Sequence, residues 1–140
     1  MFDVNLVDQD LTTVNFYNKM TQCISNQDLK QMIVDHLFQN YNIRMNCTNK
    51  YFRSFDTETD LVTLKKYPHL AYINTNHSIN LIVLAKFQNK PVCLYIDKFA
   101  GSIYLLKCQF SPSLYEGTIF EGELIETATG NYFMISDFLF

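Results

Sequence analysis

Apolar side chains recur at helical spacing most clearly between residues 26 and 40. The apolar positions that share one side of such a helix, at i, i+3, i+4 and i+8, are Leu29, Met32, Ile33 and Leu37. Ser25 is a suitable N-cap, and Asp28, three residues later, completes an acidic variant of the capping box. The pattern therefore predicts a helix over residues 26–40 with one buried face.

The rest of the N-terminal part has weaker periodicity. We expect an earlier helix over residues 10–23 and a short strand within residues 42–55, where apolar and polar side chains partly alternate. A short helix over residues 60–66 is predicted, with Asp56 or Thr59 as its cap.

From residue 70 onward the chain becomes rich in β-branched, aromatic and aliphatic residues, which is typical of strands. The predicted strands cover residues 70–73, 79–87, 92–96, 103–109, 118–125 and 132–138. Their connectors are short and contain Gly, Pro, Asn or Ser, which favours antiparallel neighbours. We therefore predict an α+β fold, in which a helical or mixed region (1–66) precedes a twisted antiparallel sheet (67–140) within one compact unit.

Composition limits the classes of function. The chain has 140 residues, 48% hydrophobic and 18% charged, which is enough for one domain with a real core. A net charge of -3 excludes a strongly basic surface that grips a nucleic-acid duplex. The chain begins without a signal-peptide pattern and has no apolar run long enough to cross a bilayer, so we expect a soluble, cytoplasmic protein with no membrane contact.

The four cysteines, Cys23, Cys47, Cys93 and Cys108, include no close pair of the kind that binds zinc. We therefore expect no structural metal and interpret them as buried free thiols in a reducing compartment. Phe, Tyr, Asn, Ile and Lys are frequent and share A/T-rich codons, which hints at an A/T-rich genome.

Several strand segments resemble the motifs of viral mRNA capping guanylyltransferases. They are V-C-L-Y-I-D-K (92–98), S-I-Y-L-L (102–106), Y-E-G-T-I-F-E-G-E-L (115–124) and Y-F-M-I-S-D (132–137). The resemblance covers roughly residues 60–140. That family belongs with the DNA and RNA ligases, whose members attach a nucleoside monophosphate covalently to a lysine. The resemblance implies that the predicted sheet is part of a nucleotidyltransferase domain.

The chain departs from the family at the catalytic motif K-x-D-G. In register with the motifs that follow, Asn74 stands at the lysine, Asn76 at the aspartate, His77 at the glycine and Ile79 at a nucleotide-gripping arginine. An amide nitrogen has no available lone pair and cannot form the covalent adduct. The sequence also stops before later family motifs. We therefore expect no catalytic residue and no cofactor.

The resemblance implies a vestigial nucleotide site at three other positions. Lys98 matches an arginine that contacts the nucleotide, Glu123 a glutamate near the ribose and metal, and Phe133 an aromatic that stacks on guanine. Each also has a simpler interpretation. Lysine lacks the bidentate guanidinium fork, Glu123 could be a solvated strand carboxylate, and sheet aromatics usually belong to a core. We interpret Asp137 as a strand-end acid and His36 as a half-buried histidine of the predicted helix.

These observations favour a non-catalytic accessory subunit of a cytoplasmic transcription or mRNA-capping complex of a DNA virus or linear plasmid. It would use a decayed guanylyltransferase-like fold to dock on larger protein subunits. Two alternatives remain open: a nucleotide or RNA-cap binding module, with weak RNA contact, and one half of a split guanylyltransferase completed by another chain.

Overall fold

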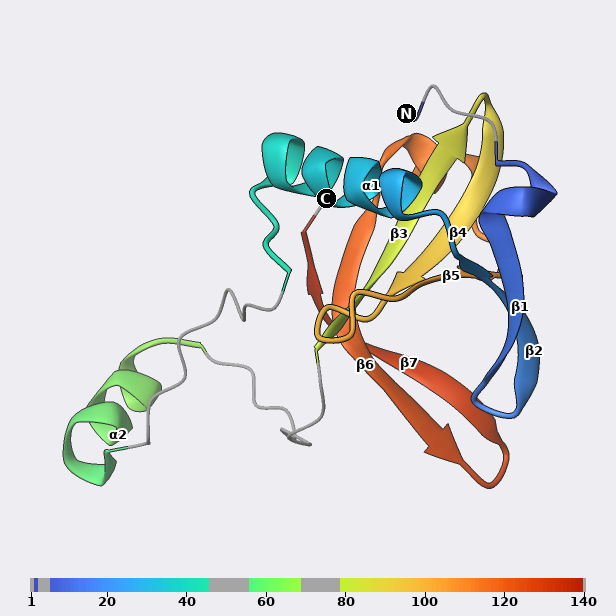
Figure 1. Cartoon of the computed structure of the whole chain (residues 1–140). Coiled ribbons are helices and arrows are strands. Elements are labelled where there is room, and N and C mark those ends of the chain that lie inside the picture. The colour runs from blue at the N-terminus through green and yellow to red at the C-terminus, as the bar shows by residue number, and fades with distance from the viewer. Residues whose placement is uncertain (1, 3–5, 46–55, 69–78, 140) are drawn as a thin grey trace.

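The protein has an α+β fold built on a seven-stranded antiparallel sheet. The structure is a computed structural model that describes residues 2, 6–45, 56–68 and 79–139. Within these residues the strand order is β1-β2-β5-β4-β3-β6-β7 (Figure 1). The strands are β1 (Leu11–Phe16), β2 (Lys19–Ile24), β3 (Asn80–Phe87), β4 (Lys90–Ile96), β5 (Ile103–Leu106), β6 (Ile119–Thr127) and β7 (Gly130–Phe138).

The helix expected over residues 10–23 is wrong, because this segment forms the β1–β2 hairpin. Its two turn residues, Tyr17 and Asn18, have φ angles of 48° and 61°, the left-handed values of a type I′ turn. β2 also pairs with β5, which is far away in the sequence (Gln22 opposite Leu105). That non-local pairing outweighs the weak helical periodicity and adds the hairpin to the sheet.

The helix α1 (Gln27–Tyr41) confirms the predicted stripe, since Leu29, Ile33 and Leu37 are buried and Met32 is partly buried. Its N-cap is Asn26 and not Ser25. The Asn26 Oδ1 accepts from the backbone N–H groups of Asp28 at 3.0 Å and Leu29 at 3.2 Å, which satisfies two of the donors at the helix start.

The helix α2 (Thr57–Lys66) begins earlier than predicted, and Asp56 is its cap. The Asp56 carboxylate accepts from the Glu58 N–H at 3.1 Å and from the Thr59 hydroxyl at 2.9 Å. Of the expected strand in 42–55, residues 42–45 are not in a strand, although Ile43 is buried. Residues 46–55, and the strand predicted over 70–73, lie outside the described residues.

The other five predicted strands are confirmed as β3–β7, with shifted ends. β5 stops at Leu106 instead of residue 109, and the chain then leads to a 3-10 helix, η2 (Pro112–Glu116). A second 3-10 turn, η1 (Asp8–Asp10), precedes β1.

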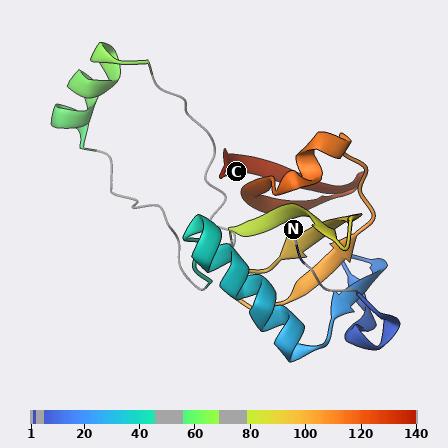
Figure 2. The same cartoon turned by 90° about the horizontal axis from the view of Figure 1, so that it is seen from above.

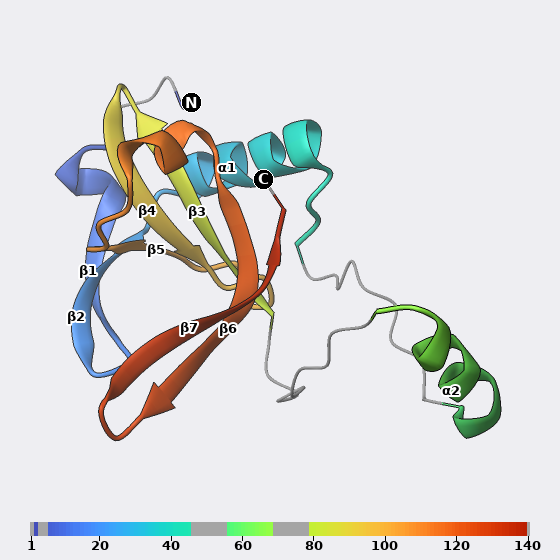
Figure 3. The same ribbon diagram turned by 180° about the vertical axis from the view of Figure 1, so that it is seen from behind.

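The sheet curls, and its two edges approach each other. The Asn18 side-chain amide donates to Glu126 Oε1 at 2.8 Å, and the Asn131 amide donates to the Tyr17 carbonyl at 3.1 Å. These bonds join the β1–β2 turn to the β6–β7 hairpin, although the two hairpins are at opposite edges of the strand order. Both hairpins reach the same end of the molecule in Figures 1 and 3. The curl gives the sheet a concave and a convex face.

Each face carries its own core. α1 lies across the convex face (Figure 2), where Ile33 and Leu37 pack in a cluster that includes Leu81, Ile96 and Ile119. The concave face holds a second cluster, mainly aromatic, with buried Ile82, Leu84, Cys93, Tyr95 and Tyr115. Tyr115 belongs to η2, so η2 covers one end of the concave face and leaves the end near the start of β3 for a pocket.

The β3–β4 turn offers a test of the local backbone. Gln88 and Asn89 connect the strands with φ angles of 44° and 65°. Asparagine tolerates this conformation better than glutamine, whose left-handed backbone costs roughly 1–2 kcal/mol. Gln88→Asn is therefore expected to raise the free energy of unfolding by about 0.5 kcal/mol in urea titrations. Gln109→Asn, at an exposed residue outside this turn, should change it by less; an equal gain in both would contradict the explanation.

Candidate functional site

A buried ion pair joins the turn that follows β4 to the strand β6. Lys98 Nζ and Glu121 Oε2 are 3.7 Å apart, and their side chains are only 5% and 2% exposed. Ile119, two residues before Glu121, belongs to the convex-face cluster, so strand alternation places Glu121 on that face. Lys98 lies in the turn after β4 and reaches Glu121 there. The charge of Lys98 is thus compensated inside the protein by a carboxylate.

Glu123 is also buried and, by the same alternation, follows Glu121 on the convex face. Its partner across β7 is Met134. It is therefore not the solvated carboxylate of the simpler interpretation. Lys98 and Glu123, two of the three residues implied by the resemblance, are thus placed on the same side of the sheet as Glu121, the acid that pairs with Lys98.

Phe133 lies on the opposite, concave face. It pairs across the strands with Leu124 and packs edge-on against Tyr95, with ring centroids 6.2 Å apart and planes at 88°. The sheet therefore separates the Phe133 ring from the carboxylate of Glu123 and the amine of Lys98. The three implied residues do not converge on one space.

The positions that match the catalytic motif are only partly described. Asn74, Asn76 and His77 lie outside the described residues, and half-buried Ile79 directly precedes β3. Asp137 is opposite Glu121 across β6 and β7, beside a β-bulge, so it lies near the end of a strand as expected.

A pocket of about 320 Å³ opens on the concave face, at the end away from η2. We call it the tyrosine pocket; it is lined by Asn15, Phe16, Tyr17, Asn80, Tyr95, Asp97, Tyr104 and Leu124. These residues come from β1 and its turn, the start of β3, the end of β4, the start of β5, and β6. They meet only because the sheet curls, and the mouth of a curled sheet is a common place for a ligand.

Aromatic rings form much of the wall. Phe16 packs on Tyr104 with ring centroids 4.3 Å apart and planes tilted by 33°. Tyr17 stands edge-on to Phe16 at 4.9 Å and 75°, and is itself exposed. The ring of Tyr95 lies 5.0 Å from Phe16 and is buried. The pocket thus combines an inner buried tyrosine with an outer, accessible one.

Hydrogen bonds with the backbone fix two polar side chains of the pocket. Asp97 Oδ1 accepts from the backbone N–H groups of Phe99 at 2.9 Å and Ala100 at 2.8 Å, which fixes its carboxylate at the end of β4. The Asn80 Oδ1 accepts from the Lys98 N–H at 3.3 Å. Asn80 therefore connects the tyrosine pocket with the segment that carries the buried ion pair.

The pKa of the Tyr95 phenol is raised above its ordinary value of 10.0, first by burial and then by the negative charges that Tyr17, Asp97 and Tyr104 can carry. A hydrogen bond with the Asn80 side chain acts in the opposite direction. Tyr95 is thus a neutral group in this site at any ordinary pH.

This shift predicts how stability changes in alkali. Unfolded chains ionise Tyr95 near pH 10, whereas the folded protein holds it neutral, so its contribution is complete below pH 10 and is lost as pH rises through the folded pKa. Tyr95→Phe should remove a loss of up to about 1.4 kcal/mol per pH unit above 10, measured by urea titrations at several pH values. Tyr132→Phe, at an exposed tyrosine, serves as the control; an identical alkaline profile in wild type and Tyr95→Phe would contradict the prediction.

Sequence reasoning missed Glu121 and the tyrosine pocket. Glu121 had a signal, because it alternates with Ile119 on the inward face of a predicted strand. The pocket had none, since Tyr17, Tyr95 and Tyr104 come together only through the curl of the sheet and a hairpin that was predicted as a helix.

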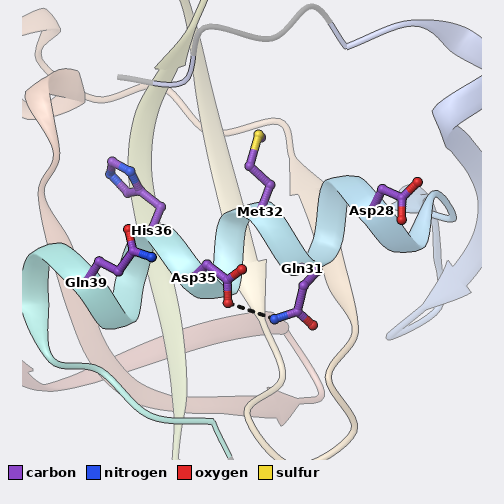
Figure 4. Close-up of a pocket in the computed structure, with 6 residues that line it drawn as sticks. All are labelled: Asp28, Gln31, Met32, Asp35, His36 and Gln39. Atoms are coloured by element: carbon purple, nitrogen blue, oxygen red, sulfur yellow. Dashed lines mark hydrogen bonds between the residues drawn. The ribbon is translucent and has the colours of Figure 1, made fainter.

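A second hollow, of about 440 Å³, runs along α1 and is lined by Asp28, Gln31, Met32, Asp35, His36 and Gln39 (Figure 4). All six belong to one helix, and Gln31 already donates to Asp35 at 2.8 Å. His36 is half-buried as expected, packs on Phe2 at 4.5 Å, and has its pKa lowered by burial. This surface is a helix flank and not a converging site.

Of the three cysteines that the structure describes, Cys93 confirms the interpretation as a buried thiol; burial raises its pKa to about 12, with Cys108 adding to the shift. Cys23 is half-buried and Cys108 is exposed, since it follows the early end of β5; Cys47 lies outside the described residues. In the described part of the chain, no group of three or more His, Cys, Asp or Glu residues could hold a metal ion. Neither described helix is long and apolar enough to span a membrane.

A comparison with protein-family models and with curated protein sequences finds no match to this chain.

Proposed function

We propose that the chain is a non-catalytic accessory subunit of a viral or plasmid transcription or mRNA-capping complex, and that it docks on larger protein subunits. The observation that supports docking is the helix α2, which lies away from the sheet in Figures 1 and 3. None of its residues is buried, and Leu61, Val62 and Leu64 are 39%, 66% and 42% exposed.

The length of α2 supports a partner. A helix of ten residues is shorter than the roughly 12–15 residues at which isolated helices become stable in water. The Asp56 cap and the basic residues of its last turn add only modest stability. Leu61 and Leu64, at i and i+3, lie on one side, and an apolar groove on a protein partner would bury both.

Two observations support the absence of catalysis. Asn74 stands at the nucleophile position of the family motif, and an amide cannot form the lysine adduct. Lys98 is paired with Glu121, while Phe133 and Glu123 lie on opposite faces. The transcription or capping context rests on the resemblance of residues 92–98, 115–124 and 132–137 to the guanylyltransferases.

Affinity purification of the tagged chain from cells that naturally produce it tests the proposal. We expect transcription or capping proteins to co-purify with the wild type and to be lost with Leu61→Asp/Leu64→Asp. Thr63→Asp, an added charge elsewhere on the same helix, should keep them. A chain that purifies without such proteins, or a double variant that retains them, would overturn the docking proposal.

The non-catalytic part has its own test. The purified complex, incubated with α-labelled GTP and Mg²⁺, should yield no label covalently attached to this chain. A labelled adduct on the chain would overturn this part alone.

A further inference from the structure

We infer that the tyrosine pocket receives the guanidinium group of an arginine presented by a protein partner. The inference rests on the proposed docking function, and it names the chemistry that the partner brings to a second place on the molecule. α2 and the tyrosine pocket share no residues, so the two can be tested separately.

The rings suit a flat cation. Tyr17 is exposed at the mouth, and half-buried Tyr104 is packed on Phe16 at 4.3 Å, so ring surface lines a space that opens to solvent. Aromatic faces attract cations through their quadrupole, and a guanidinium also stacks on them. Asn18 and Asn131 tie the Tyr17 turn to the opposite hairpin, which fixes the backbone that carries the outer ring before a ligand arrives.

The charged groups at the tyrosine pocket are negative. Asp97 supplies a carboxylate that two backbone N–H groups hold in position, and the amide oxygen of exposed Asn15 can accept a further hydrogen bond. Among the described residues, neither lysine nor arginine lines the pocket. Glu126, bonded to Asn18 beside Tyr17, adds a second negative charge nearby. These negative groups favour binding of a cation and disfavour the phosphates of a nucleotide, which require several positive partners.

Among side-chain cations, arginine fits better than lysine. Its guanidinium is planar, less strongly hydrated, and presents several N–H donors that can reach a carboxylate and amide oxygens while the plane lies on a ring. A lysine ammonium is a compact, strongly hydrated point charge and would gain less from the Tyr17 and Tyr104 rings. The cavity of about 320 Å³ has room for such a group.

Titration of the full chain with the peptide acetyl-Gly-Gly-Arg-Gly-Gly-amide tests the inference. The chain contains no Trp, so tyrosine fluorescence and aromatic NMR signals can follow binding at the pocket. We expect saturable binding with shifts at Tyr17 and Tyr104. The same peptide with neutral citrulline, which keeps the shape, should bind at least about ten-fold more weakly, and the lysine peptide should also bind more weakly.

Variants distinguish binding at the pocket from non-specific attraction of the peptide to negative charge. Asp97→Asn can still accept the two backbone N–H groups and should weaken the arginine peptide about ten-fold. Tyr17→Leu should weaken it roughly five-fold. Asp35→Asn removes the same charge from the α1 hollow, whose lining contains neither Phe nor Tyr, and should leave binding unchanged.

Absence of saturable binding, equal binding of the citrulline peptide, or equal effects of Asp97→Asn and Asp35→Asn would overturn the inference. So would tighter binding of 7-methyl-GTP at the same residues, which would assign the pocket to a nucleotide. The two proposals can fail separately. If Leu61→Asp/Leu64→Asp loses the co-purifying proteins but the wild type binds no arginine peptide, the docking proposal stands and the arginine inference fails. If the chain binds the arginine peptide but purifies without transcription or capping proteins, the pocket's preference for arginine stands and the docking proposal fails.

Discussion

Glu121→Gln is expected to lower the free energy of unfolding by about 3–5 kcal/mol, the usual cost of breaking a buried ion pair from one side. The substitution leaves the Lys98 ammonium, whose side chain is 5% exposed, without the carboxylate that lies 3.7 Å away. A domain of this size has a total stability of roughly 5–15 kcal/mol, so a large share of it would be lost. Urea denaturation followed by circular dichroism measures the change.

The chain contains a matched control. Lys86 and Glu116 also form an ion pair, but the Glu116 side chain is 63% exposed, and Glu116→Gln should cost less than about 1 kcal/mol. Lys98→Met/Glu121→Leu removes both buried charges and should recover most of the stability lost in Glu121→Gln. Equal costs for Glu121→Gln and Glu116→Gln would show that the buried pair contributes no more than a surface pair.

The ion pair also bears on what the family resemblance implies. The resemblance assigns Lys98 to a nucleotide, whereas in the structure it forms an ion pair with the buried Glu121 carboxylate. A cation already balanced by a buried acid attracts a phosphate less than a free one. The strands that carry the family-like motifs can therefore be explained by packing and charge balance within the fold.

Much of the fold was predictable because its signals are local. The stripe of α1 and the β-branched, aromatic strands β3–β7 can each be read within one segment. The β1–β2 hairpin could not, because its turn uses Tyr17 and Asn18 without a glycine, and because β2 is held by β5 from the other half of the chain. Its residues gain their strand conformation from a neighbour that a local pattern does not contain.

The candidate site was predictable only in part, for a related reason. Lys98 and Glu123 were identified through their motifs, and the convex-face position of Glu123 follows from alternation along β6. The tyrosine pocket depends on the curl of the sheet, which brings Tyr17 to the same opening as Tyr104. The two hairpins of the curled sheet are joined by side-chain bonds such as that from Asn131 to the Tyr17 carbonyl, between residues far apart in the sequence.

Gly122→Ala is expected to lower the free energy of unfolding by about 3 kcal/mol, the upper part of the range for overpacking. A Cβ atom at this position would lie 2.2 Å from the Met134 carbonyl oxygen and 2.8 Å from Phe133 Cε1. The carbonyl belongs to the backbone of β7, which cannot move without disturbing its pairing with β6. Urea denaturation and amide exchange of the β6–β7 pair measure the effect.

Two comparisons identify the cause. Gly101→Ala meets no atom within 4 Å but has a φ of 70°, so it should cost only the roughly 1–2 kcal/mol of a left-handed backbone. Gly122→Ala/Phe133→Leu removes the ring contact and should not restore stability, because the contact with the Met134 carbonyl remains. Full recovery in the double variant would place the constraint in the Phe133 ring. Without recovery, close packing of β6 on β7 is sufficient to require the glycine of the E-G-E-L segment, and no nucleotide is needed to account for it.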